Sequence, residues 1–324
     1  LLQNNSLTPQ AIQNDDSRFW NLTEVISDHD QHVLAHRLDR LYLGYTGEKV
    51  VLKVGRQAVS WGNGLLYNPV DFFNPFDPAA VDKEYKAGDD MVYGQYLQDS
   101  GNDLQFVSVW RRDINGSSNQ DVNTNAFKYH AFIGEQELDL ILAQHYDDTI
   151  ASLGGITSWG GAIARGDIML TKTDTDTYWS LVFNLSYSWT LLGKNTLGVI
   201  EYLHNGLGIN ESDYKQLSDY PDLTSRLSRG ELFTLGKNYL ASSLTLEVNP
   251  LFNVSPTLFI NLADGSGLLQ LSSTYDPAQN WQLLAAFNLP FGSDGTEFGG
   301  LNSAVEGLQL SSGPSLFAQL AWYF

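Results

Sequence analysis

The stretch YWSLVFNLSYSW, residues 178–189, alternates between apolar and mostly polar side chains. The apolar set comprises Trp179, Leu181, Phe183, Leu185, Tyr187 and Trp189. Successive side chains of a β-strand point to opposite faces, so the stretch predicts a strand with one apolar face. Aromatic residues lie at both ends of the apolar set, which suits a strand that meets a lipid–water interface at each end.

The same period of two recurs along the chain, most clearly over 240–247, 281–289 and the final 316–324. The predicted outward apolar band includes Leu181, Phe183, Leu185, Leu283, Phe287 and Leu320. A transmembrane strand needs about nine to eleven residues. Sixteen stretches of about that length are candidates, namely 18–27, 33–45, 48–58, 90–99, 102–112, 126–134, 137–147, 149–158, 161–171, 177–190, 194–206, 237–248, 251–264, 266–275, 279–290 and 313–324.

The lengths of the connections support one all-β domain, an antiparallel up-and-down barrel of about sixteen strands over 18–324. If the last strand runs toward the periplasm, the periplasmic connections are short. They are 46–47, 100–101, 135–136, 159–160, 191–193, 249–250 and 276–278. The external side then receives the four longest connections, 59–89, 113–125, 207–236 and 291–312, together with four short ones. This topology places residues 1–17 and the C-terminus in the periplasm.

Composition narrows the classes of function. The chain has 18 Lys and Arg against 37 Asp and Glu, a formal net charge of −19, so it is not expected to bind nucleic acid through phosphate contacts. It has no Cys, which excludes a disulfide framework, a thiolate nucleophile and Cys-ligated metal. The longest uncharged stretches, 177–193 and 307–324, carry too many polar residues for a membrane helix.

Over 18–324 the chain resembles Gram-negative outer-membrane β-barrels. Its terminal LFAQLAWYF is similar to the aromatic-ended last strand that the barrel-assembly machinery reads in such proteins. The resemblance implies an outer-membrane location, with the lipid bilayer and the assembly machinery as partners. In addition, GRQAVSWG at 55–62 is similar to a GRQ-x-x-SWG stretch of porin-like outer-membrane proteins, some of which are associated with exporters of lipid-like molecules.

The segment 59–89 is unusually apolar for an external loop, and two Asn-Pro pairs divide it. We therefore expect it to fold into the barrel, either as a plug that only packs or as the lining of a permeation path. The predicted constriction residues are Lys53, Arg56, Trp61, Tyr67, Asp71, Phe72, Phe73, Phe76 and Asp77. In this prediction Lys53 and Arg56 at the base of the loop pair with Asp71 or Asp77.

Charged residues within strands should point inward, because Lys or Arg facing lipid at mid-membrane costs about 2–4 kcal/mol. The predicted lumen-wall residues are Arg37, Asp39, Glu201 and Glu247. Further inward candidates are His36, Arg40, Arg111, Lys128, Asp139, His145, Arg165 and Asp167. Arg37 and Arg40 cannot face the same side of one regular strand.

These features favour a passive channel for small solutes, hydrophobic or cationic, with no enzymatic activity, cofactor or metal. One alternative is a barrel that acts as the partner of an envelope exporter or lipid-transport machine. A second is an outer-membrane hydrolase, for which His145 beside Asp147 and Asp148 is the best candidate for a general base. His29 and His32, with Asp28 and Asp30, are a weaker candidate for a metal site.

Overall fold

The computed structural model describes residues 15–29, 32–211, 214–302, 309–310 and 313–323. The strands of its main sheet are β3 (Leu41–Thr46), β4 (Val50–Gln57), β5 (Asp89–Leu97), β6 (Asp103–Val109), β7 (Thr124–Ile133), β8 (Gln136–His145), β9 (Asp148–Trp159), β10 (Ala162–Lys172), β11 (Thr177–Leu191), β12 (Lys194–His204), β13 (Asn238–Asn249), β14 (Phe252–Asn261), β15 (Gly267–Ala278), β16 (Trp281–Phe291) and β19 (Ser315–Trp322). The other elements are β1 (Thr23–His29), β2 (His32–Arg37), β17 (Leu301–Asn302), β18 (Gln309–Leu310), the 3-10 helix η1 (Leu217–Asp219) and α1 (Pro221–Arg229).

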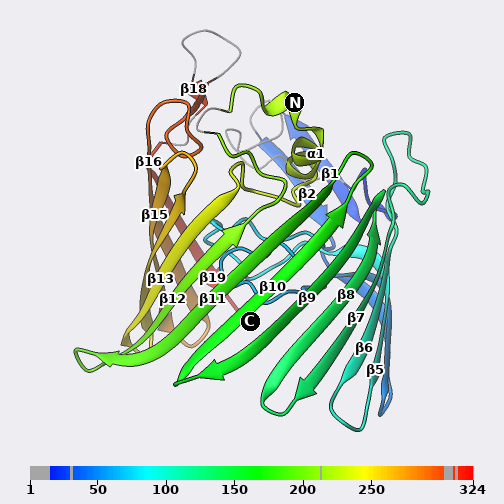
Figure 1. Cartoon of the computed structure of the whole chain (residues 1–324), viewed down its shortest axis with the longest axis horizontal. Helices are drawn as coiled ribbons and strands as arrows, with labels where there is room; N and C mark the ends of the chain where they lie inside the picture. Colours follow the sequence, from blue (N-terminus) through cyan, green and yellow to red (C-terminus); the bar gives the residue numbers. More distant parts are fainter. Residues whose placement is uncertain (1–14, 30–31, 212–213, 303–308, 311–312, 324) are drawn as a thin grey trace.

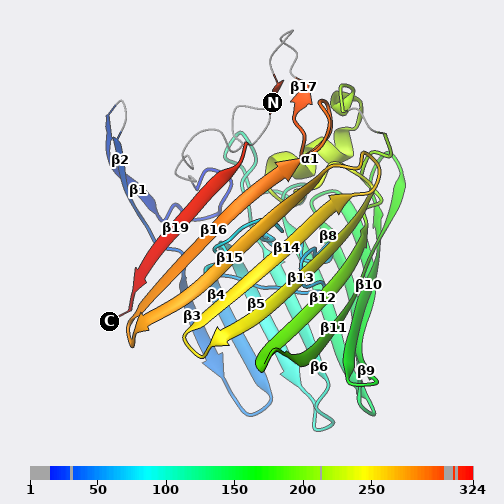
Figure 2. The same cartoon turned by 90° about the vertical axis from the view of Figure 1, so that its left-hand side faces the viewer.

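The main sheet is antiparallel, and each strand pairs with the strands before and after it in the chain, except that β16 pairs with β19 past the separate pair β17-β18; the order is β19-β16-β15 and onward to β3. The sheet has fifteen strands. Figures 1 and 2 show that the strands are tilted and curve around an interior. The predicted all-β, up-and-down architecture is therefore confirmed. The strands β3 and β19 form the two edges of the sheet, and no pairing joins them within the described residues.

The two faces of the sheet differ as the period of two predicts. On β11, Ser180, Val182 and Asn184 are buried, whereas Trp179 and Phe183 are exposed. Leu283, Phe287 and Leu320 are also exposed, on β16 and β19. Polar side chains together with part of the apolar ones thus face the interior, and an exposed apolar band faces outward, which is the arrangement of a barrel whose outer surface contacts lipid.

The connections alternate in length as expected. Tight turns such as 192–193 and 279–280 lie at one end of the sheet, and the long loops lie at the other end (Figure 2). The long loop after β12 contains α1, which begins with Pro221 and ends at Arg229, and Gly230 just past it has a left-handed conformation with φ of 69°. Pro at the first turn and Gly just past the last turn are the usual helix boundaries. No helix in the described part of the chain is long and apolar enough to cross a membrane.

The first two predicted strands differ from the structure. The strands Thr23–His29 and His32–Arg37 pair with each other as a separate sheet, β1-β2, and β3 begins only at Leu41, so the main sheet has fifteen strands and not sixteen. The chain bends between β2 and β3, where Arg37 pairs with Asp39 and Arg40 donates to the carbonyls of Asp39 and Lys86. This break resolves the conflict in side-chain direction between Arg37 and Arg40.

The N-terminal segment also differs from the expected topology. The backbone of Arg18 forms an isolated antiparallel β-bridge with the backbone of Arg111, just beyond the end of β6. The Asp15 carboxylate accepts from Arg56 near the end of β4. The described residues 15–22 therefore lie at the end of the sheet that carries the long loops. Residues 1–14 of the predicted periplasmic segment, and 303–308 and 311–312 of the predicted external loop, lie outside the described residues.

Candidate functional site

The loop 59–89, between β4 and β5, crosses the interior of the sheet (Figure 1). Its backbone amides at Leu65, Leu66 and Tyr67 all donate to the carboxylate of Glu201 on β12, over 2.7, 2.9 and 2.5 Å. Glu201 is buried. A carboxylate that accepts several backbone N–H bonds makes stronger hydrogen bonds than a neutral acceptor would. The predicted wall residue Glu201 therefore anchors the tip of the loop.

A second carboxylate holds the loop on the neighbouring wall. Asp167 on β10 accepts the backbone N–H and the side-chain amide of Asn63, each over 2.6 Å. Asn184 on β11 donates to the carbonyl of Asn63 over 3.0 Å. Gly64 follows directly, and a Cβ placed there would lie 1.8 Å from the carbonyl oxygen of Tyr67. The tight bend that brings three amides to Glu201 thus requires glycine at this position.

The aromatic side chains of the loop are buried in two clusters. Trp61 packs edge-on against Phe72 and Phe73, and its indole N–H donates to Gln105 on β6 over 2.9 Å. The apolar wall around this cluster comprises Met91, Val107, Val109, Ala126, Ile141, Ala143, Ile150 and Met169. Tyr67 packs separately against Tyr239 and Phe259 on β13 and β14. These contacts fix the loop against two regions of the inner wall.

The base of the loop is closed by Lys86, a residue that the sequence analysis did not single out. Its ammonium donates to Asp71 over 2.6 Å, to the carbonyl of Val59 over 2.6 Å and to Ser60 over 2.9 Å. Burial raises the pKa of Asp71 to about 6, although the Lys86 ammonium opposes the rise. Burial disfavours the charged form of Lys86 as well, and for an ammonium this lowers the pKa.

The predicted pairing of Lys53 and Arg56 with Asp71 or Asp77 is wrong. The Arg56 guanidinium is fully buried and contacts Asp90 on β5 over 2.9 Å and Asp15 over 3.0 Å. The Lys53 ammonium lies over the rings of Tyr42 and Tyr93. Both basic residues are on β4, whose neighbours β3 and β5 supply closer partners than the loop does.

The remaining predicted residues lie apart from these anchors. The Asp77 carboxylate accepts the amide of Ala79 over 2.8 Å and caps a turn. Arg37 and Asp39 pair over 2.8 Å where the chain bends after β2, outside the strands of the main sheet. Glu247 accepts from Asn195 over 2.9 Å, near the turn that joins β11 and β12. A role of these residues in a pore remains a prediction.

Two cavities border the loop. The smaller, about 70 Å3, lies between the loop and the segment 226–234, and Phe76 lines it with Tyr67, Phe72 and Phe233. The larger, about 450 Å3, lies between residues 81–84 and the inner faces of β15, β16 and β19. The polar side chains that line the larger cavity are Asp82, Lys83, Glu84, Thr274, Gln282, Gln319 and Tyr323.

The long loops at the outer end form a cap over the interior loop. Glu231 contacts His145 over 3.1 Å and Arg229 over 2.8 Å, and Arg226 pairs with Asp148. Burial alone would raise the pKa of Glu231, but His145 and Arg229 lower it to about 2. His145, the predicted general base, contacts Glu231 of the cap and Thr124 of β7.

A second part of the cap centres on Glu297 in the loop after β16. Its carboxylate accepts from Tyr239 over 2.5 Å, from Asn261 over 2.7 Å and from the backbone amide of Leu235 over 2.9 Å. Burial raises the pKa of Glu297 to about 7. Sequence reasoning missed this residue, because its partners are 36 to 62 positions away and no local pattern marks it.

In the part of the chain that the structure describes, no group of three or more His, Asp and Glu side chains is arranged to hold a metal ion. The weaker metal-site candidate falls outside this part, since Asp30 and the side chains of Asp28, His29 and His32 are not described.

No family model and no curated protein matches the sequence. Among solved structures, the chain is similar to Wzi of Escherichia coli, described as a carbohydrate-binding β-barrel of the outer membrane involved in group 1 capsule assembly. The TM-score is 0.57 at 10% identity, over 91% of this chain and 71% of Wzi.

The chain also aligns with a BenF-like porin from Pseudomonas fluorescens, with a TM-score of 0.48 at 10% identity over 86% of this chain and 76% of the porin. OccK7 (OpdD) of Pseudomonas aeruginosa gives a TM-score of 0.45 at 12% identity over 90% and 81%. At such identities the likeness to Wzi shows a shared fold. The chain therefore has the fold of outer-membrane β-barrels, as the sequence resemblance indicated.

Proposed function

We propose that the protein is a passive outer-membrane channel for small solutes, narrowed by the loop 59–89. The apolar outer face of the sheet supports the membrane location, because such a face is stable in lipid and costly in water. The polar side chains that line the larger cavity support an aqueous path through that part of the interior. The anchors at Asp167 and Glu201 support a fixed constriction that remains in place when solutes pass.

The observation that carries this proposal is the position of the loop within the barrel. It packs against the walls from β5 to β15, where Gln270 donates to the carbonyl of Ala79 over 2.8 Å, and it leaves the larger cavity between residues 81–84 and the inner faces of β15, β16 and β19. That cavity, about 450 Å3, has the size of sites that hold small molecules. Asp82 and Glu84 against Lys83 give it a net negative charge, so we infer that cations pass more readily than anions.

Recordings from purified protein in planar bilayers test the proposal. Under a salt gradient, wild-type protein should show discrete conductance steps and a reversal potential of the sign that cation preference gives. Glu84→Gln should move the reversal potential toward that of a non-selective pore, since Glu84 lines the cavity. Glu135→Gln is the matched control, because Glu135 is exposed at the β7–β8 turn. Electrical silence of folded, inserted protein would overturn the channel function.

A second candidate function is binding of carbohydrate at the outer end of a sealed barrel. Wzi is described as carbohydrate-binding, and the fold of this chain is similar to that of Wzi. The smaller cavity under the cap combines Phe72 and Phe233 with the polar Asn205, and aromatic and amide groups together suit a sugar ring. At about 70 Å3 it is smaller than a ligand site of about 300–1,000 Å3, so this candidate requires the cap to move outward when sugar binds. This candidate predicts no conductance together with saturable binding of an oligosaccharide. Conductance without such binding would exclude it.

A further inference from the structure

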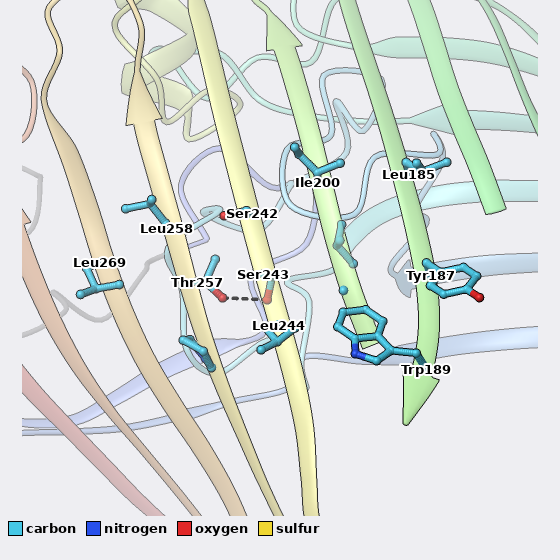
Figure 3. A pocket seen from close by; sticks show the side chains of 13 residues that line it. Leu185, Tyr187, Trp189, Ile200, Ser242, Ser243, Leu244, Thr257, Leu258 and Leu269 are labelled. Atoms are coloured by element: carbon cyan, nitrogen blue, oxygen red, sulfur yellow. Dashed lines mark hydrogen bonds between the residues drawn. The ribbon is translucent and has the colours of Figure 1, made fainter. Parts of the chain in front are cut away.

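A groove of about 490 Å3 lies on the outer face of the sheet, across β11 to β15. Figure 3 shows its sides, with Leu185, Tyr187 and Trp189 along β11 and Leu258 and Leu269 on the strands beyond. These side chains belong to the apolar, outward-facing set. The groove therefore opens toward the surroundings of the barrel and is separate from the interior site.

The floor of the groove is made by residues with small side chains. Gly198 pairs with Leu244, and Ser242 pairs with both Ile200 and Leu258, so small residues alternate with large ones across the strands. A Cβ added to Gly198 would lie 2.7 Å from the Trp189 ring, so the indole lies over Gly198 and closes this end of the groove. On the opposite face Ser243 and Thr257 share a hydrogen bond of 2.9 Å that ties the strands together beneath the floor (Figure 3).

A positive charge lies at the short-turn end of this groove. Lys194 begins β12 and is exposed, and it shares the outward face of that strand with Gly198. Four residues of strand at about 3.3 Å each place the two Cα atoms about 13 Å apart. Lys194 forms no ion pair with any residue that the structure describes. Trp189, on the neighbouring strand, pairs with Thr196 between Lys194 and Gly198.

Along this face the Lys194 ammonium, the Trp189 indole and the apolar groove follow one another. A phospholipid presents its charged headgroup, its interfacial region and its acyl chains in the same order. Indole rings favour the level of the membrane interface, and Lys side chains near that level attract anionic headgroups. An acyl chain that starts beside Lys194 passes along the Trp189 indole, which covers Gly198, and runs over Ser242 toward the middle of the apolar band. On a flat wall the same chain would contact fewer protein atoms, because large side chains would hold it away from the strands.

We propose that this groove binds an anionic phospholipid, with its phosphate beside Lys194 and one acyl chain along the Trp189 indole and over Ser242. The inference rests on the outer-membrane location in the proposed function, but it does not require that the barrel conduct ions.

Native mass spectrometry of the full chain tests this site. The protein is purified in mild detergent with equal amounts of dioleoylphosphatidylglycerol and dioleoylphosphatidylcholine. Wild-type protein should retain one phosphatidylglycerol in preference to phosphatidylcholine. Ser242→Phe fills the floor and should lower that retention several-fold, whereas Lys194→Gln should remove the preference for phosphatidylglycerol over phosphatidylcholine.

Ala285→Phe is the matched control, because Ala285 lies on the outward face of β16, beyond the groove, and should leave retention unchanged. Circular dichroism and heat-dependent gel mobility check that each variant folds. Equal retention in wild type and folded Ser242→Phe would overturn the proposal. A dimer that forms in wild type and is lost in Ser242→Phe would also overturn it, since the groove would then contact a second copy. Failure of wild type to insert into lipid vesicles would instead refute the membrane location itself.

Discussion

At the residue scale, Glu201 has the most consequential position in the interior, because one side chain accepts three consecutive backbone amides of the loop. Glu201→Ala would leave these amides without their acceptor, at about 1–3 kcal/mol for each buried group that stays unsatisfied. We expect the loop to loosen and single-channel conductance to increase several-fold. Glu201→Gln keeps one acceptor oxygen and should give an intermediate increase.

Glu247→Gln serves as the control for this prediction, since Glu247 pairs with Asn195 near the opposite end of the barrel and does not contact the loop. Amide hydrogen exchange at residues 65–67 gives an independent measurement and should accelerate in Glu201→Ala. Unchanged conductance and exchange in a folded Glu201→Ala variant would show that the aromatic clusters alone hold the loop.

The sequence could predict burial of the loop but not its ion pairs. Trp61, Phe72 and Phe73 are apolar wherever they lie, so their burial in the interior follows from hydrophobicity alone. The partner of a charge depends on which segments approach it in three dimensions. Arg56 therefore contacts Asp90 on the adjacent strand, and Asp71 contacts Lys86 from the far end of the loop.

At the scale of elements, the cap should respond to pH through Glu297. Its pKa is raised to about 7 in the folded cap, against an ordinary value near 4.5, so folding favours the protonated form. The stability of the cap is therefore greatest below about pH 4.5 and falls as the pH rises through 7. The raised value arises from burial, and the neighbouring Asp264 carboxylate adds to it.

We accordingly expect limited proteolysis of the segment 207–236 to proceed several-fold faster at pH 8 than at pH 5.5. Glu297→Gln has no charge to lose or gain, so cleavage of that variant should be nearly independent of pH over the same interval. The same pH dependence in wild type and Glu297→Gln would assign the effect to another group, such as His145 at its contact with Glu231.

The strands were predictable because their signal is local, whereas the hairpin at the start of the chain was not. Each strand shows a period of two because its side chains face lipid and the interior in alternation. The break between β2 and β3 arises from contacts of Arg37 with Asp39 and of Arg40 with the carbonyl of Lys86. The latter joins residues 46 positions apart, which no period within a strand can reveal.

At the scale of the whole molecule, the alternation of short and long connections predicted the architecture better than any single strand did. The alternation arises from the up-and-down direction of all the strands and not from where each strand ends. An error in one strand boundary therefore does not change it. The part of the interior that remains open to solutes was not predictable in this way. It follows from the side of the wall to which the loop is anchored, because Asp167, Asn184 and Glu201 hold residues 63–67 against β10, β11 and β12 and the larger cavity remains beside β15, β16 and β19.

The chain contains no Cys, so a single introduced thiol reports on one position. Gln319 and Leu320 are neighbours on β19, of which Gln319 lines the larger cavity and Leu320 is exposed on the outer face. The most direct measurement of the central claim is the conductance of Gln319→Cys in a planar bilayer before and after a charged, water-soluble thiol reagent is added. We predict that the reagent lowers this conductance markedly and leaves that of Leu320→Cys unchanged. No change in Gln319→Cys after confirmed modification of its thiol would contradict a conduction route along β15, β16 and β19.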